Sequence, residues 1–112
     1  MWIRSAFWIG RPKAGFEEQF VTEVNDVLRP ALRACPGIRD VLILWPHERE
    51  DNPPEIACQL LLMFERAEDI TTMLVSPERD AVRLKVPAII ALFDGAVSHV
   101  NFEAISDNRF AD

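Results

Sequence analysis

The sequence lacks the local motifs that identify most cofactor-dependent enzymes. Its four glycines are scattered, so no glycine-rich loop is available to hold a phosphate group. Its two histidines and two cysteines show no metal-type spacing, and no serine nucleophile motif occurs. We interpret Cys35 and Cys58, which lie among apolar residues, as ordinary buried thiols. An enzyme built from this sequence would have to work by proton transfer, positioning and exclusion of water.

The chain also lacks a cluster of basic residues. Its net charge is −6, which argues against nucleic acid or an anionic membrane as the main partner. The apolar segment 1–10 is interrupted by Arg4 and Ser5, is too short to span a bilayer and does not have the layout of a signal peptide. We therefore interpret it as the first strand of a cytoplasmic protein. The length of 112 residues, of which 49% are hydrophobic, predicts one folded domain over 1–112.

Hydrophobic periodicity predicts the element order β-α-β-β-α-β. Strands are expected at 2–9, 38–45, 55–65 and 96–105, and long helices at 16–34 and from Ser76 to Gly95. Ile70, Met73 and Leu74 mark a short helix with Glu68 and Asp69 in its first turn. Pro30 is expected to kink the first helix and Pro87 to bend the last one, while the proline-rich segment 46–54 forms an exposed loop. Ser76 and Pro77 suit the N-cap and first turn of the last helix, and Gly95 suits its end.

This order predicts an α+β, ferredoxin-like domain in which helices cover one face of a four-stranded antiparallel sheet. The strands are apolar on both faces, and a chain this short exposes much of its surface. Packing the second sheet face against the same face of another copy would give a homodimer, the arrangement called a dimeric α/β barrel.

Several short motifs, in this order, resemble the dimeric α/β-barrel superfamily and, within it, the EthD-like proteins. They are Trp2–Ile9 followed by Arg11–Lys13, Asn25–Pro30, Pro36–Gly37, Ser76–Arg79, and Leu92–Gly95 with Ser98–His99. The last two motifs are most similar to the RedY/HapK-like proteins of bisindole and prodigiosin-type pigment pathways. The superfamily includes oxygenases, isomerases, dehydratases and haem-binding enzymes, so the fold alone does not choose a reaction.

The narrower resemblance implies a cofactor-free enzyme that acts on an aromatic, indole- or pyrrole-derived intermediate of natural-product biosynthesis, with a dehydratase, hence a lyase, as the leading candidate. Many EthD-like proteins carry a histidine two residues before the helix proline, where this chain has Leu28. Because this histidine is missing and the sequence has no other cluster of ligand residues, we expect no bound haem, flavin or stoichiometric metal.

His99 is the candidate catalytic residue, because an imidazole titrates near neutral pH and can act as acid or base. The alternative is a hydrogen-bonded histidine of the core or of a dimer interface. Alternation along the strand places Asn101 on the same face as His99, where its amide can orient the imidazole or bind substrate. The pocket is expected between sheet and helices, with Val86, Ile90 and Phe93 as its opposite wall and the 46–54 loop at its opening.

Further substrate contacts are expected from one polar side chain and several large apolar ones. Gln59, in an apolar strand, is either a ligand contact or part of the dimer interface. The apolar candidates, which would stack on an aromatic ligand or else belong to the plain core, are Trp8, Trp45, Met63 and Phe93. Arg4 is expected to form an ion pair with Glu65 or Glu103, and His47 belongs to the exposed loop.

Two classes of function follow from these residues. The first is an enzyme in which His99 moves a proton on an enclosed aromatic substrate, by dehydration or as a cofactor-free oxygenase. The second is a non-catalytic dimer that binds or carries a reactive hydrophobic molecule. Replacing His99 would abolish turnover in the first and leave the effect of the protein nearly intact in the second.

Overall fold

Four strands with alternating apolar residues pair into one antiparallel sheet. The computed structural model describes residues 1–107. The strands are β1 (Trp2–Pro12), β2 (Asp40–Leu44), β3 (Ile56–Phe64) and β4 (Phe93–Glu103). Their order across the sheet is β2-β3-β1-β4, with every neighbouring pair antiparallel. The predicted ferredoxin-like arrangement is therefore confirmed.

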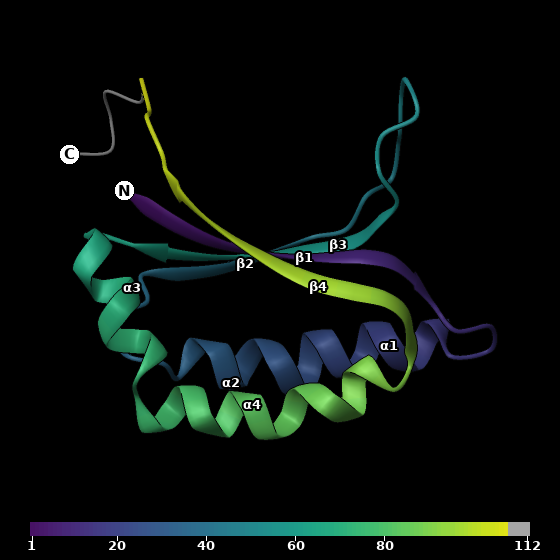
Figure 1. Ribbon diagram of the computed structural model, residues 1–112, viewed down its shortest axis with the longest axis horizontal. Coiled ribbons are helices and arrows are strands. Elements are labelled where there is room, and N and C mark those ends of the chain that lie inside the picture. The colour runs from purple at the N-terminus through teal and green to yellow at the C-terminus, as the bar shows by residue number, and fades with distance from the viewer. Residues whose placement is uncertain (108–112) are drawn as a thin grey trace.

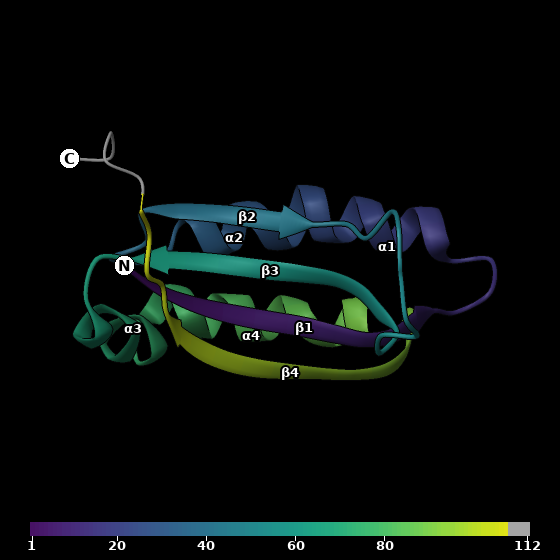
Figure 2. The same ribbon diagram turned by 90° about the horizontal axis from the view of Figure 1, so that it is seen from above.

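The helices cover one face of this sheet (Figures 1 and 2). The segments α1 (Glu17–Glu23), η1 (Val24–Leu28) and α2 (Arg29–Arg33) follow one another without a break. Beside them lies α4 (Pro77–Ile90), and the short α3 (Ala67–Leu74) lies at one end of the sheet. None of the helices within residues 1–107 is both long enough and apolar enough to cross a bilayer.

The first helical region differs from the simple kinked α-helix expected over 16–34. Its middle part, η1, is a π-helix, in which the N–H of Arg29 donates to the carbonyl of Val24. This wider turn comes directly before Pro30, which has no N–H and whose ring would collide with a carbonyl one turn earlier in a regular α-helix. The chain thus accommodates Pro30 by widening the turn rather than by breaking the helix.

The start of α4 is fixed by the cap that the sequence predicts. The Ser76 hydroxyl accepts a hydrogen bond from the Arg79 backbone N–H at 3.2 Å, and Pro77 occupies the first turn. Ser76 also donates to the Met73 carbonyl at 2.7 Å, which ties α4 to the end of α3. This cap sets the rotation of α4 and hence the side chains that it turns toward the sheet.

An aromatic cluster joins the helices to the sheet. Phe20 of α1 is fully buried and stacks on Phe93, with ring centroids 5.2 Å apart. Trp8 of β1 meets both rings edge to face, at 5.4 and 5.3 Å, and Trp45 approaches Phe20 from the other side at 6.3 Å. Edge-to-face and offset-stacked pairs are the favoured aromatic geometries, so this cluster anchors the core.

The other face of the sheet carries no helix (Figure 1). Its large side chains are partly exposed: Leu42 40%, Leu44 44%, Val100 42% and Phe102 43%. A hydrogen bond of 3.1 Å from the Gln59 amide to the Ser5 hydroxyl crosses this face between β3 and β1. The domain thus has a second hydrophobic sheet surface that its own helices leave uncovered.

Gly95 does not end the last helix, contrary to the expectation from the sequence. The helix α4 ends at Ile90, and β4 begins at Phe93, so Gly95 lies inside the strand and pairs with Gly10 of β1. Its φ of +152° is one that residues with a side chain rarely adopt, and a methyl group there would collide with the Ile9 carbonyl oxygen. The glycine is needed for close approach of two strands rather than for a helix end.

We expect Gly95→Ala to destabilise the protein more than Gly15→Ala. Gly15 also has a positive φ, +86°, but no atom lies within 4 Å of a methyl group built there, so Gly15→Ala should cost only the backbone strain of about 1–2 kcal/mol. Gly95→Ala adds the collision with β1. Urea denaturation of the two variants measures the difference, and equal losses of stability would show that the close pairing of Gly10 and Gly95 is unimportant.

Candidate functional site

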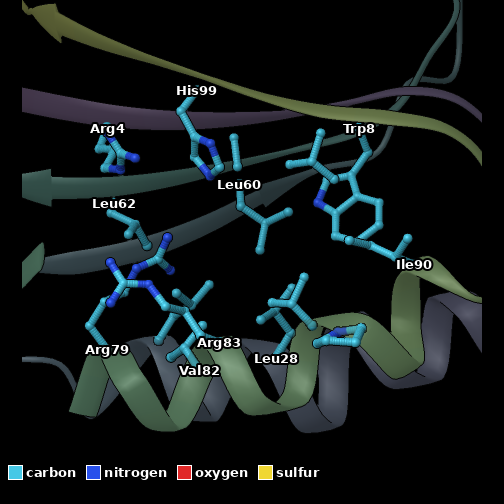
Figure 3. Close-up of a pocket in the computed structure, with 15 residues that line it drawn as sticks. Arg4, Trp8, Leu28, Leu60, Leu62, Arg79, Val82, Arg83, Ile90 and His99 are labelled. Atoms are coloured by element: carbon cyan, nitrogen blue, oxygen red, sulfur yellow. The ribbon is translucent and has the colours of Figure 1, made fainter. Parts of the chain in front are cut away.

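A cavity of about 340 Å³ lies between the sheet and the helices. Its walls come from β1, β3 and β4 on the sheet side, from α4 on the helix side, and from Leu28 and Leu32 of the first helical region. Figure 3 shows side chains from both layers pointing into it. A cavity of this size and mostly apolar lining is typical of a small-molecule site.

One end of the cavity is apolar. Trp8, which is 2% exposed, forms this end together with Ile90, and Leu60 lies between them and the middle (Figure 3). The Trp8 ring is held from behind by Phe93 and Phe20. A fixed indole with one free side offers a stacking surface for a flat, hydrophobic molecule.

The other end of the cavity is positively charged. Arg4 points into it from β1, while Arg79 and Arg83 rise toward it from α4 (Figure 3). Arg4 lies there because even-numbered residues of β1 face the helices, in the series Arg4, Ala6, Trp8. Arg79 and Arg83 lie one turn apart on the inward side of α4.

His99 projects into the cavity from β4, between Arg4 and Trp8 (Figure 3). It is paired with Ala6 across the β1–β4 ladder, and the small alanine leaves space for the imidazole. Because β4 is the edge strand, the residue remains accessible to solvent. Within residues 1–107 the His99 ring forms no hydrogen bond.

The three arginines differ in their partners. Arg4 donates to the Asn101 side-chain oxygen at 3.0 Å, and Arg83 pairs with Asp80 at 2.9 Å. The Arg79 guanidinium makes no ion pair with any described residue, and its Nε atom is buried without a hydrogen-bond partner. Among the described residues that line the cavity, none is acidic. Positive charge is therefore left uncompensated at this end.

This charge and the burial set the protonation of the site. Burial, followed by the charges of Arg4 and Arg79, holds the pKa of His99 below its usual value near 6.5. The imidazole is therefore neutral at pH 7 and can accept a proton. Burial and the neighbouring guanidiniums also lower the pKa of Arg4 and of Arg79, although an arginine side chain stays cationic in proteins.

The structure brings some of the predicted site residues together and separates others. His99 and Trp8 line the cavity, Asn101 holds Arg4, and Phe93 lies behind Trp8 in the core. Trp45 contacts Phe20 and does not line this cavity. The expected apolar wall is formed by Val86 and Ile90, without Phe93.

Gln59 and Met63 lie on the opposite face of the sheet, so the expectation that they share a pocket with His99 is wrong. Gln59 pairs with Phe7 and Met63 with Ile3, both odd-numbered residues of β1, whereas the cavity is lined by the even-numbered ones. The reason is the strict alternation of β-strands, which sends neighbouring residues to opposite faces. Gln59 instead donates to Ser5 on the uncovered face.

Two further expectations are corrected. Arg4 does not pair with Glu65 or Glu103 among the described residues, because Glu65 is 3.0 Å from Arg39 and Arg4 donates to Asn101. The loop 46–54, with His47, projects from the side of the sheet away from the helices and does not border the cavity (Figure 1).

The sequence analysis missed Arg79 and Arg83 as site residues. A signal was present, since Arg79, Val82, Arg83, Val86 and Ile90 recur at intervals of three or four and so share one helix face. Charged residues within an otherwise apolar inward stripe are unusual. That pattern marks a site more specifically than the aromatic residues did.

Neither cysteines nor metal-type clusters offer a second kind of chemistry here. Burial raises the pKa of Cys58 to about 12 and also raises that of Cys35, so both stay protonated thiols at neutral pH. Within residues 1–107, no three His, Cys, Asp or Glu side chains gather where they could hold a metal ion. The absence of a bound cofactor remains a prediction.

No protein-family model matches the chain, and no curated protein matches its sequence. Its backbone is nevertheless similar to solved structures. An EthD family protein from Bacillus halodurans gives a TM-score of 0.76 at 12% identity, over 94% of this chain and 100% of that one. The chain therefore shares the fold of that EthD family protein.

Two other structures share this fold. A dimeric ferredoxin-like protein of unknown function from Jannaschia sp. gives a TM-score of 0.64 at 14% identity, over 93% of this chain and 100% of that one. A candidate antibiotic biosynthesis monooxygenase from Deinococcus radiodurans gives 0.62 at 16% identity, over 95% of this chain and 94% of that one. The narrower resemblance to RedY/HapK-like proteins is not tested by these structures and stays a prediction.

The lowered pKa of His99 predicts a specific pH dependence of stability. As the pH falls below about 6.5, the unfolded chain takes up a proton on His99 before the folded chain does. The folded state therefore loses stability as the pH falls from about 6.5 through the lower, folded pKa.

We expect His99→Gln to lose less thermal stability than the unmodified protein between pH 7.5 and pH 5. Melting temperatures at the two pH values measure this, with His47→Gln on the exposed loop as the matched control. If His99→Gln and the unmodified protein lose the same amount, the imidazole does not lie in the desolvated, positively charged setting described above.

Proposed function

We propose that this protein is a cofactor-independent enzyme that encloses a hydrophobic aromatic molecule and uses His99 to move a proton. The observation that carries the proposal is a neutral imidazole beside uncompensated guanidinium groups at one end of an apolar cavity. A neutral imidazole is a base, and nearby cations stabilise the anion that proton removal creates. Together the groups favour proton abstraction.

The charge changes of such a step balance within the cavity. When His99 takes a proton from the substrate, the electron pair of the broken bond stays on the substrate as an enolate- or phenolate-type anion. The imidazolium then faces Arg4, which disfavours it, but the new anion lies among the same cations and offsets this repulsion. Proton transfer and anion formation are thus coupled.

Dehydration is the reaction that we favour. It requires removal of a proton from carbon and delivery of a proton to the departing hydroxyl group. Among the described residues that line the cavity, His99 is the one whose side chain is an ordinary acid–base group near neutral pH, so it would have to perform both transfers in turn. Such a dehydratase would eliminate water from one face of its substrate.

The structural neighbours support a role in small-molecule chemistry without choosing this reaction. The Deinococcus radiodurans neighbour is described as a candidate monooxygenase, which keeps a cofactor-free oxygenase as an alternative. The cavity would also suit a carrier, since binding a hydrophobic molecule needs no acid–base group. The response to replacing His99 separates a carrier from an enzyme, and turnover without oxygen separates a dehydratase from an oxygenase.

The uncovered sheet face supports assembly into a homodimer, and the Jannaschia neighbour is described as dimeric. Partly exposed Leu42, Leu44, Val100 and Phe102 make this face apolar, and contiguous apolar surface of this kind is typical of an interface. Two copies joined there would keep both cavities on the outside, under the helices, where substrates can enter.

We expect replacement of His99 to abolish turnover while binding persists. Indole- and pyrrole-derived hydroxy compounds are the substrates to screen, with loss of water followed by mass spectrometry under nitrogen. With an active compound, His99→Asn and His99→Ala should each lower kcat by at least about 10²-fold, as removal of a general acid–base group does. Full activity of His99→Ala would exclude the proposed role of the imidazole.

The matched control for this experiment is His47→Ala, which removes the second histidine from the exposed loop. It should leave kcat unchanged. Compounds that bind with no chemical change in any variant would favour the carrier alternative, and turnover only in the presence of oxygen would favour the oxygenase.

We expect size-exclusion chromatography with light scattering to give twice the mass of one chain at micromolar concentration. Phe102→Glu, which puts a charge on the apolar sheet face, should weaken or abolish the dimer. The control is Leu84→Glu, because Leu84 lies on α4 and is 84% exposed. A stable, folded monomer of the unmodified protein would contradict the proposed assembly.

A further inference from the structure

Outside the cavity, each described arginine has a hydrogen-bond acceptor: three pair with carboxylates, and the other three, Arg29, Arg33 and Arg49, donate to backbone carbonyls. Arg11 pairs with Glu55 at 2.9 Å, Arg39 with Glu65 at 3.0 Å and Arg66 with Asp69 at 3.3 Å. The chain has 18 acidic and 12 basic residues, so carboxylates are plentiful. Nevertheless, none of the described residues that line the cavity is acidic.

The unpaired arginine charge at one end of the cavity destabilises the folded protein. The Nε atom of Arg79 is buried and has no hydrogen-bond partner, and Arg4 is balanced only by the neutral amide of Asn101. A buried donor without a partner destabilises the folded state, and in native proteins such atoms are few and call for an explanation. A ligand that supplies the missing acceptor would provide one.

We infer that the natural ligand of this cavity carries an anionic oxygen group, such as a carboxylate, which binds between Arg4 and Arg79 at the charged end. This inference deepens the proposed function and rests on its use of the cavity as a small-molecule site. Guanidinium groups bind carboxylates through paired N–H donors, and such charge-assisted hydrogen bonds are strong. Arg83, already paired with Asp80, would contribute mainly long-range charge.

The two ends of the cavity then orient the ligand. Its apolar ring would lie against Trp8 and Ile90, and its anionic group would lie at the arginines (Figure 3). His99 lies between these ends (Figure 3), so it would lie beside the atoms that join the ring to the anionic group. The substrate class is therefore an aromatic acid, and the proton that His99 moves belongs to the segment next to the acid group.

The test compares an acid with its neutral amide of the same shape. Indole-3-acetate and indole-3-acetamide differ in charge but hardly in size, and calorimetry measures the affinity of each. We expect the carboxylate to bind at least about tenfold more tightly, which is the expected effect of one charge-assisted hydrogen-bonded pair. Equal affinities, or no binding of the carboxylate below about 1 mM, would overturn the inference.

Arg79→Met should remove the preference for the carboxylate while leaving the amide's affinity within about twofold. The matched control is Arg39→Met, which deletes an equal charge at an exposed ion pair and should keep the preference. Equal loss of carboxylate affinity in both variants would show that only net charge matters, and would also overturn the inference. Arg79→Gln provides a second variant if Arg79→Met does not fold.

Stability gives an independent readout of the role of Arg79. Because its guanidinium is unpaired, Arg79→Met should melt no lower than the unmodified protein, whereas a merely structural arginine would be needed for stability. His99→Asn should keep the preference for the carboxylate. An intact preference without turnover in any variant would therefore reject the proposed catalysis and leave this inference standing.

Discussion

The contact among Trp8, Phe20 and Phe93 is the interaction on which the rest of the structure depends. It joins β1, α1 and the start of β4 at one end of the core, and each aromatic pair contributes about 1 kcal/mol beyond the surface that it buries. Toward the other end, the gap between sheet and helices is lined by aliphatic and arginine side chains instead. The cavity lies next to the aromatic cluster, and Trp8 belongs to both.

The chemistry of the cavity follows from the lack of acidic side chains among its described lining residues. A helix with a hydrogen-bonded cap, α4, turns Arg79 and Arg83 toward the sheet, and Arg4 meets them from β1. Asp80 pairs with Arg83, but no carboxylate among the described residues that line the cavity balances Arg4 or Arg79. Burial, followed by the same positive charge, lowers the pKa of His99, and that charge also prepares the site for an anion, so it supports both the proposed base and the inferred ligand.

The Gly10–Gly95 pair shows that the role of a glycine near a helix end depends on its tertiary surroundings. A glycine shortly after a helix is a common stop signal, and the sequence around Gly95 fits that pattern. The helix instead ends earlier, and Gly95 lies inside β4, where it pairs closely with Gly10 of the neighbouring strand β1. A single residue type serves both purposes, because each requires only the absence of a side chain.

The sequence by itself determined the order of elements, the antiparallel ferredoxin-like sheet and the Ser76 cap, because hydrophobic periodicity and capping act over a few neighbouring residues. It did not determine which strand faces share a cavity. Strand register and pairing decided that Gln59 lies on the uncovered face and that Arg4 meets Asn101 rather than an acidic side chain. Only the tertiary structure brought Arg4, Arg79 and His99 together, because they come from three elements that are far apart in the chain. The effect of the two arginine charges on the pKa of His99 depends on their distance in space, which the sequence does not give.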